Sequence, residues 1–148
     1  MMTENIHALV NYRLEQADES IEAASTLLNK NLIRPSVNRA YYAMFYAVLA
    51  LLAKGKKETS KHSGVIALFD KDFVKQGIFK KDYSRWLHDA FDLRQRSDYT
   101  AEYHASPEDA EMTLMMGVSP ARAASRRASS MASSYEAWPE SSHCWKRP

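Results

Sequence analysis

Apolar residues recur at helical spacing over most of the chain. Between about Asn5 and Leu28 they fall three or four positions apart, and acidic residues occupy the opposite side. This pattern predicts one long amphipathic helix. A second helix is expected from Pro35 and Ser36 to Gly55, since proline suits a first helical turn and glycine an end. Because it is apolar on nearly every side, we expect it to be the central helix.

Two shorter helices are predicted in the middle of the chain. The third runs from about Ser60 to Lys75 and ends before Gly77, and the fourth spans roughly Lys81 to Tyr99. The apolar residues predicted to face inward on them are Val65, Leu68, Phe69, Phe73, Trp86, Leu87, Ala90, Phe91 and Leu93.

A fifth helix has a clear beginning. Ser106 is a preferred cap, Pro107 suits the first turn, and Glu108 complements the helix dipole. We expect this helix to run to about Met116. After Gly117 the apolar period is lost and Ser and Arg recur, which is typical of disorder.

Two explanations of residues 118–148 stay open. The segment is an unstructured tail, or a frameshift has replaced the remaining turns of the fifth helix, which needs about two more turns to cover a bundle. In both cases residues 1–117 form the domain, and the tail is assigned neither a fold nor a site.

The composition favours helices over sheets. The 148 residues include only four glycines and five prolines, and no β-rich segment competes with the helical pattern. The predicted fold class is all-α, an up-and-down antiparallel bundle of four to five helices. The apolar run of the second helix is too short to span a bilayer. The single Cys144 cannot form an internal disulfide, so a cytoplasmic location is expected.

The positive net charge of +2 does not indicate a nucleic-acid-binding domain. Residues 118–148 contain five basic and two acidic residues, which leaves residues 1–117 with a net charge of −1. Bulk charge therefore says nothing about RNA.

The stretch RQRSDYTAEYH, from Arg94 to His104, gathers residues that could serve either structure or chemistry. Arg94 and Asp98 are one turn apart and continue the inward stripe of the fourth helix. A half-buried arginine needs an anionic partner, and Asp98 can supply it. Arg39 of the second helix, with Tyr42 and Tyr46 on the same side, would complete a polar seam across the bundle. Three interpretations remain: a structural cluster, a binding pocket without strong catalysis, and a nuclease site.

Four segments together resemble one known family. RAYYAMFYAVLALLAKG, KHSGVIALFDKDFVKQG, LRQRSDY and the SPEDA helix start are similar to the HEPN domain family, in its order, over about Asn5 to Leu114. The resemblance implies a bundle that commonly forms homodimers. It also implies frequent pairing with a minimal nucleotidyltransferase in a toxin–antitoxin system. The HEPN member is often a metal-independent ribonuclease, whose motif is an Arg, four to six residues and a His near the end of this fourth helix.

The chain departs from that motif. No histidine falls in the window after Arg94 or Arg96; His104 is three residues too far from the first and one too far from the second. Cleavage of RNA through its 2′-hydroxyl needs a group that moves a proton, and histidine titrates near working pH. The catalytic candidates are therefore atypical, and the full candidate set comprises Arg94, Asp98, Tyr99 and His104 for catalysis and Arg39, Tyr42, Tyr46, His62 and Arg96 for binding.

Two functional classes follow. The favoured one is an interaction module that binds a nucleotidyltransferase partner, a nucleotide or RNA without strong catalysis. The alternative is a metal-independent ribonuclease with an atypical site at Arg94 and Asp98. No cofactor, metal site or membrane partner is expected. A homodimer is expected, because a short fifth helix would leave apolar faces of the first and fourth helices uncovered.

Overall fold

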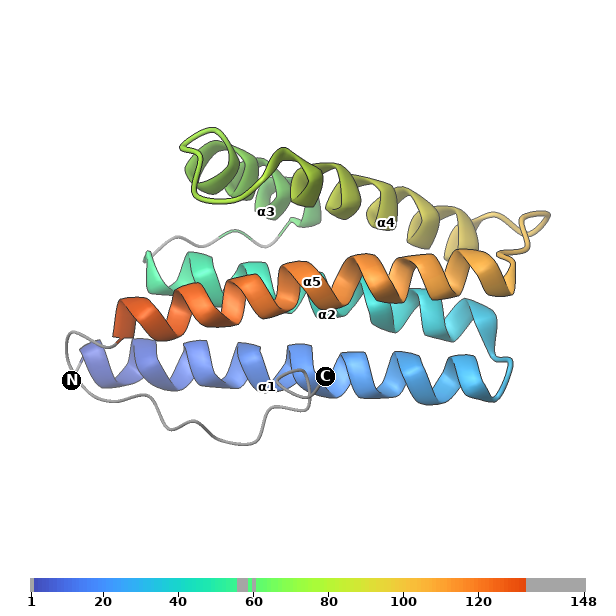
Figure 1. Ribbon diagram of the computed structural model, residues 1–148, viewed down its shortest axis with the longest axis horizontal. Coiled ribbons are helices and arrows are strands. Elements are labelled where there is room, and N and C mark those ends of the chain that lie inside the picture. The colour runs from blue at the N-terminus through green and yellow to red at the C-terminus, as the bar shows by residue number, and fades with distance from the viewer. Residues whose placement is uncertain (1, 56–58, 60, 133–148) are drawn as a thin grey trace.

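The protein, seen here as a computed structural model, is all-α. The structure describes residues 2–55, 59 and 61–132, and within these ranges it contains five α-helices and no strand (Figure 1). The predicted fold class, an antiparallel helical bundle, is confirmed. None of the described helices is both long and apolar enough to cross a membrane.

The first two helices form an antiparallel hairpin (Figure 1). α1 (Met2–Asn29) and α2 (Ile33–Lys54) are joined by a short turn in which Asn31 has a left-handed backbone with φ of 61°. The hydroxyl of Ser36 donates a hydrogen bond of 2.8 Å to the carbonyl of Ala24, which ties the helices together near this turn. The inward stripe predicted for α1 is buried at Val10, Leu14, Ala17, Ile21 and Ala24.

α2 is the central helix, as its sequence predicts. It contacts α1, α3, α4 and α5, and more than half of its residues are buried. A helix surrounded in this way has no polar face to keep in water, which explains its nearly continuous apolar sequence. Its C-terminal end at Lys54, followed by Gly55, agrees with the prediction.

The third predicted helix is a composite of two parts. α3 (His62–Phe69) is followed by a π-helical turn, η1 (Asp70–Val74). The wider turn accompanies a cluster of three rings, Phe69, Phe73 and Phe79, whose centroids lie 5.6 to 5.9 Å apart. Gly77 then reverses the chain with φ of 75°, a conformation that favours glycine. The predicted start at Ser60 lies outside the described residues.

α4 (Lys81–Tyr99) begins and ends where the sequence predicts, and α5 (Pro107–Ala132) begins there too. The predicted cap is confirmed. The Asp109 amide donates to the Ser106 hydroxyl at 3.1 Å, and the Ser106 amide donates to the Asp109 carboxylate at 3.0 Å. This reciprocal pair is a capping box in which aspartate takes the usual place of glutamate.

The predicted end of the fifth helix near Met116 is wrong. α5 continues to Ala132, and Ala121 and Ala124 belong to the hydrophobic core. Gly117 does not stop the helix but lets it approach α2: a Cβ there would lie 3.0 Å from the Ala40 carbonyl oxygen. The part of the predicted tail at 118–132 is therefore helical, whereas residues 133–148, including Cys144, lie outside the described residues.

Candidate functional site

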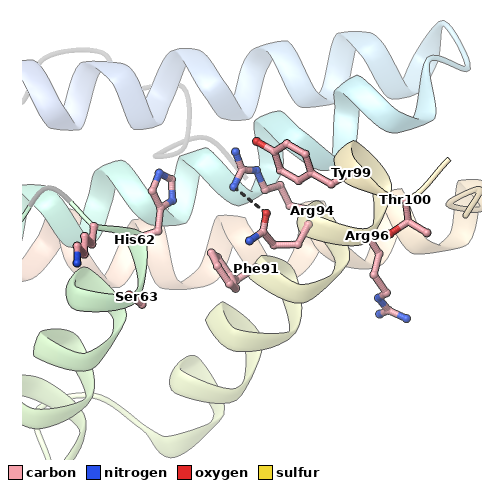
Figure 2. Close-up of a pocket in the computed structure, with 9 residues that line it drawn as sticks. His62, Ser63, Phe91, Arg94, Arg96, Tyr99 and Thr100 are labelled. Carbon is pink, nitrogen blue, oxygen red and sulfur yellow. Dashed lines mark hydrogen bonds between the residues drawn. The ribbon is translucent and has the colours of Figure 1, made fainter.

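An open pocket lies between the start of α3 and the C-terminal half of α4. Figure 2 shows His62 and Ser63 on one side of it and Arg94, Arg96, Tyr99 and Thr100 on the other. Its volume is about 840 Å³, within the range of small-molecule sites. The described residues that line it include three cations and no carboxylate; they are Lys61, His62, Ser63, Phe91, Arg94, Gln95, Arg96, Tyr99 and Thr100.

Arg94 is the cation at the back of this pocket, with a side chain that is only 12% exposed. Its Nε lies 3.3 Å from the Oδ2 atom of Asp98, one helical turn away, so the predicted ion pair is confirmed. The geometry of this contact is not that of a hydrogen bond. Nη2 donates a hydrogen bond of 3.1 Å to the hydroxyl of Tyr42 on α2. The guanidinium group is thus held between two helices.

Polar contacts link α2 and α4, and they include the predicted Arg39 and Tyr42 together with Asn38, which was not predicted. Asn38 donates to the Asp98 carboxylate at 2.8 Å and accepts two hydrogen bonds from Arg39 at 2.8 and 3.1 Å. The Arg39 guanidinium carbon lies 4.9 Å from the centre of the Tyr42 ring. Tyr46 contacts this polar seam through its ring, whose centroid lies 5.6 Å from that of Tyr42. Sequence reasoning missed Asn38, because a single amide on a helix has no pattern that marks it.

His62 stands in the first turn of α3, with its ring stacked on Phe45 at a centroid distance of 4.2 Å. Its Nδ1 lies 2.8 Å from the hydroxyl of Tyr41, a buried residue of α2. Burial lowers the pKa of His62 below its usual 6.5, and the nearby Arg94 charge lowers it further. The imidazole is therefore neutral at physiological pH. Burial also raises the pKa of Tyr41, which keeps that hydroxyl protonated.

The remaining candidates differ in position. Tyr99 ends α4 with 73% of its surface exposed, and the Arg94 guanidinium carbon lies 5.6 Å from its ring centre. Arg96 is exposed at the pocket wall and lies 5.1 Å from the ring centre of Tyr103. His104 is exposed in the loop between α4 and α5 and does not line the pocket. The fold thus brings His62, Arg94, Arg96 and Tyr99 together and leaves His104 apart.

Five pocket residues were not among the sequence candidates: Lys61, Ser63, Phe91, Gln95 and Thr100. Phe91 was predicted only to face inward on its helix, and each of the other four is adjacent in sequence to a candidate. Only the packing of α3 against α4 places them around one space. Within the part of the chain that the structure describes, no three His, Cys, Asp or Glu residues are grouped closely enough to hold a metal ion.

Comparisons with known proteins point to one family. The HEPN domain matches residues 10–116. Two proteins of Methanocaldococcus jannaschii are each named "Putative toxin". One is 36% identical over 104 residues, covering 70% of this chain and 71% of the relative, and the other is 34% identical over 114 residues, covering 77% and 84%. A UPF0332 protein of Thermotoga maritima is 38% identical over 91 residues, covering 62% of this chain and 69% of that protein.

Proposed function

Since the chain belongs to the HEPN domain family, we propose that it is the helical module of a two-component system of the toxin–antitoxin type. The names of the two archaeal relatives support this assignment. The pocket between α3 and α4 binds phosphate groups of RNA or of a nucleotide. A minimal nucleotidyltransferase is the partner, as the family resemblance implies.

The positive charge of the pocket is the observation that supports phosphate binding. Lys61, Arg94 and Arg96 all line this pocket, and its described lining residues include no carboxylate. Arginine recognises phosphate through paired donors, and lysine adds a point charge. Tyr99 offers an exposed ring beside these cations, and such a ring stacks on bases. A cationic wall with an adjacent aromatic surface suits a single-stranded RNA segment or a nucleotide.

The candidate residues of α4, taken alone, are better suited to binding RNA than to cleaving it. Tyr99 occupies a position where ribonuclease members of the family would have histidine, and a phenol is a poorer proton acceptor than an imidazole at neutral pH. Arg94 can stabilise phosphate charge but cannot take the proton of a 2′-hydroxyl.

Fluorescence anisotropy with labelled single-stranded RNA tests this proposal. We expect the affinity to fall as the salt concentration rises from 50 to 200 mM. A plot of the logarithm of the association constant against the logarithm of the salt concentration should have a slope of about −0.7 per phosphate contacted. Arg96→Gln should weaken binding and reduce that slope. Arg85→Gln is the matched control, because Arg85 is an exposed arginine of the same helix outside the pocket. Equal binding by both variants and the wild type would refute the pocket as the RNA site.

The partner is tested separately. We expect the gene for a small nucleotidyltransferase to lie next to the gene for this chain. Expression of the chain alone should slow growth of the host, and co-expression with that neighbour should restore it. Unimpaired growth in both cases would contradict the toxin assignment, whereas growth arrest that the neighbour does not relieve would contradict the partner.

A further inference from the structure

We propose that His62 is the general base of an RNA-cleaving site, so that α3 supplies the imidazole that α4 lacks. This inference rests on the proposed function, because RNA must first bind in the pocket. It assigns a proton-transfer role to a residue that lies outside the Arg and His motif of the fourth helix.

Two side chains from different helices share one part of the pocket. His62 and Arg94 both line the pocket, and both lie against the same pair of tyrosine rings of α2. The ring centroid of His62 lies 5.9 Å from that of Tyr41 and 5.7 Å from that of Tyr42. The Arg94 guanidinium carbon lies 5.7 and 5.4 Å from the same two ring centres. Figure 2 shows the His62 ring and the Arg94 guanidinium group on neighbouring parts of the pocket, so a phosphate held by Arg94 would lie on the side where the imidazole is.

The imidazole is held in one orientation. Stacking on Phe45, with only 11° between the ring planes, fixes the plane of the His62 ring. The contact of 2.8 Å with the Tyr41 hydroxyl fixes its rotation. When Nδ1–H donates to that hydroxyl oxygen, Nε2 carries no proton and can act as a base. The second nitrogen of a catalytic histidine is commonly oriented in this way, although by a carboxylate in the best-known enzymes.

The groups facing the imidazole favour its neutral form. They are the protonated hydroxyl of Tyr41 and the ring of Tyr42 on α2, and Arg94 of α4, whose charge repels a proton. His62 is also the one histidine among the described residues of the pocket wall. The site thus holds a base and a cation in the forms that attack on a phosphodiester requires.

The bonds and protons of the cleavage step balance with RNA, His62 and water alone. Nε2 of His62 takes the proton of the 2′-hydroxyl, and the 2′-oxygen forms a bond to phosphorus. The bond from phosphorus to the 5′-oxygen breaks, and that oxygen takes a proton from water. His62 then returns its proton to solvent. The products are a 2′,3′-cyclic phosphate and a 5′-hydroxyl end, and Arg94 balances the charge that grows on the phosphate oxygens.

The test measures binding and cleavage of the same labelled RNA by the full chain in the presence of chelator. We expect the wild type to release fragments with 2′,3′-cyclic ends. His62→Gln should lower the cleavage rate about 100-fold or more while RNA affinity changes little. His88→Asn is the matched control, because His88 is bonded to Asp70 and lies outside the pocket. Its rate should equal that of the wild type.

Two further readouts separate proton transfer from a structural role. The cleavage rate of the wild type should rise with pH, with a midpoint below the usual pKa of histidine, and this rise should be absent in His62→Gln. His62→Ala, which leaves a space beside Phe45, should regain activity when imidazole is added. A circular dichroism melt establishes that each variant is folded.

The outcomes distinguish this inference from the proposed function. Salt-dependent binding of RNA without cleavage by the wild type would overturn the role of His62 and leave the binding function standing. Absence of binding would overturn both. Cleavage that survives in His62→Gln, or that disappears in His104→Asn, would place the base elsewhere.

Discussion

Arg94 is a mostly buried charge whose partners come from two helices. Its ion pair with Asp98 was predictable, because both residues lie on the inward stripe of one helix, a turn apart. Its bond to Tyr42 and the link from Asp98 to Asn38 join residues more than 50 positions apart. Local spacing cannot reveal such contacts, since they depend on how α2 and α4 pack.

Removal of the anionic partner should destabilise the fold. Asp98→Ala leaves the Arg94 charge, only 12% exposed, without its carboxylate, and should lower the free energy of unfolding by about 2 kcal/mol. Arg94→Met should cost less, because the stem packing is retained and Asn38 still bonds to Asp98. Urea denaturation measures both values. Asp89→Ala, at an exposed aspartate of the same helix, is the control and should change stability by less than about 0.5 kcal/mol. Equal effects of Asp98→Ala and Asp89→Ala would mean that the pair is solvated.

His62 should make stability depend on pH. Its pKa is lowered in the folded state by burial and by Arg94, so the unfolded chain binds more protons below pH 6.5. The resulting stabilisation is complete above pH 6.5 and is lost as pH falls through the lowered folded-state pKa. Denaturation at pH 7.5 and pH 5 should therefore show a larger loss for the wild type than for His62→Phe, which keeps the stack on Phe45. An identical loss in the two proteins would show that His62 titrates normally.

At the scale of elements, α5 differs most from its prediction. Its buried stripe consists of small residues, at Ala110, Thr113, Gly117, Ala121 and Ala124. These positions recur at helical spacing, but alanine and glycine also occur in unstructured segments. A periodicity of large apolar residues therefore ends at Met116 although the helix does not. The small side chains let α5 approach α2 closely, as the 3.0 Å distance at Gly117 indicates.

The continuation of α5 is directly testable. Ala121→Asp places a carboxylate at a fully buried position of the core and should destabilise the protein by about 3 kcal/mol or more. Arg126→Asp, at an exposed position of the same helix, is the matched control and should have a small effect. Thermal melts compare the two variants. If Ala121→Asp were as stable as the wild type, residues beyond Gly117 would not pack on the bundle.

At the scale of the molecule, the bundle is covered more fully than the sequence predicts. A short fifth helix would leave the first and fourth helices uncovered, whereas α5 contacts α1, α2 and α4 along the bundle. The bundle instead exposes Met112 and Met115 on α5, with 60% and 74% of their surfaces accessible. Methionine is enriched at protein–protein interfaces, so these two side chains mark the face of α5 that could associate.

We still expect a symmetric homodimer, now through this face of α5. Light scattering at micromolar concentration should give twice the mass of the 16.9 kDa chain. Met112→Glu combined with Met115→Glu should shift the mass towards the monomer, whereas Glu111→Gln, at an exposed neighbour, should not. A monomeric wild type would exclude the dimer, and a dimeric double variant would place the interface elsewhere.

The sequence by itself determined the helical class, the order of the helices, the central place of α2, both ends of α4 and the pairing of Arg94 with Asp98. These features depend on periodicity, caps and contacts within one helix, all of which are local. Only the tertiary structure decided that α5 extends to Ala132 and that His62 lies with Arg94 in one pocket. Both depend on how closely helices distant in sequence approach one another, and side-chain size and packing angle set that approach without leaving a periodic signal.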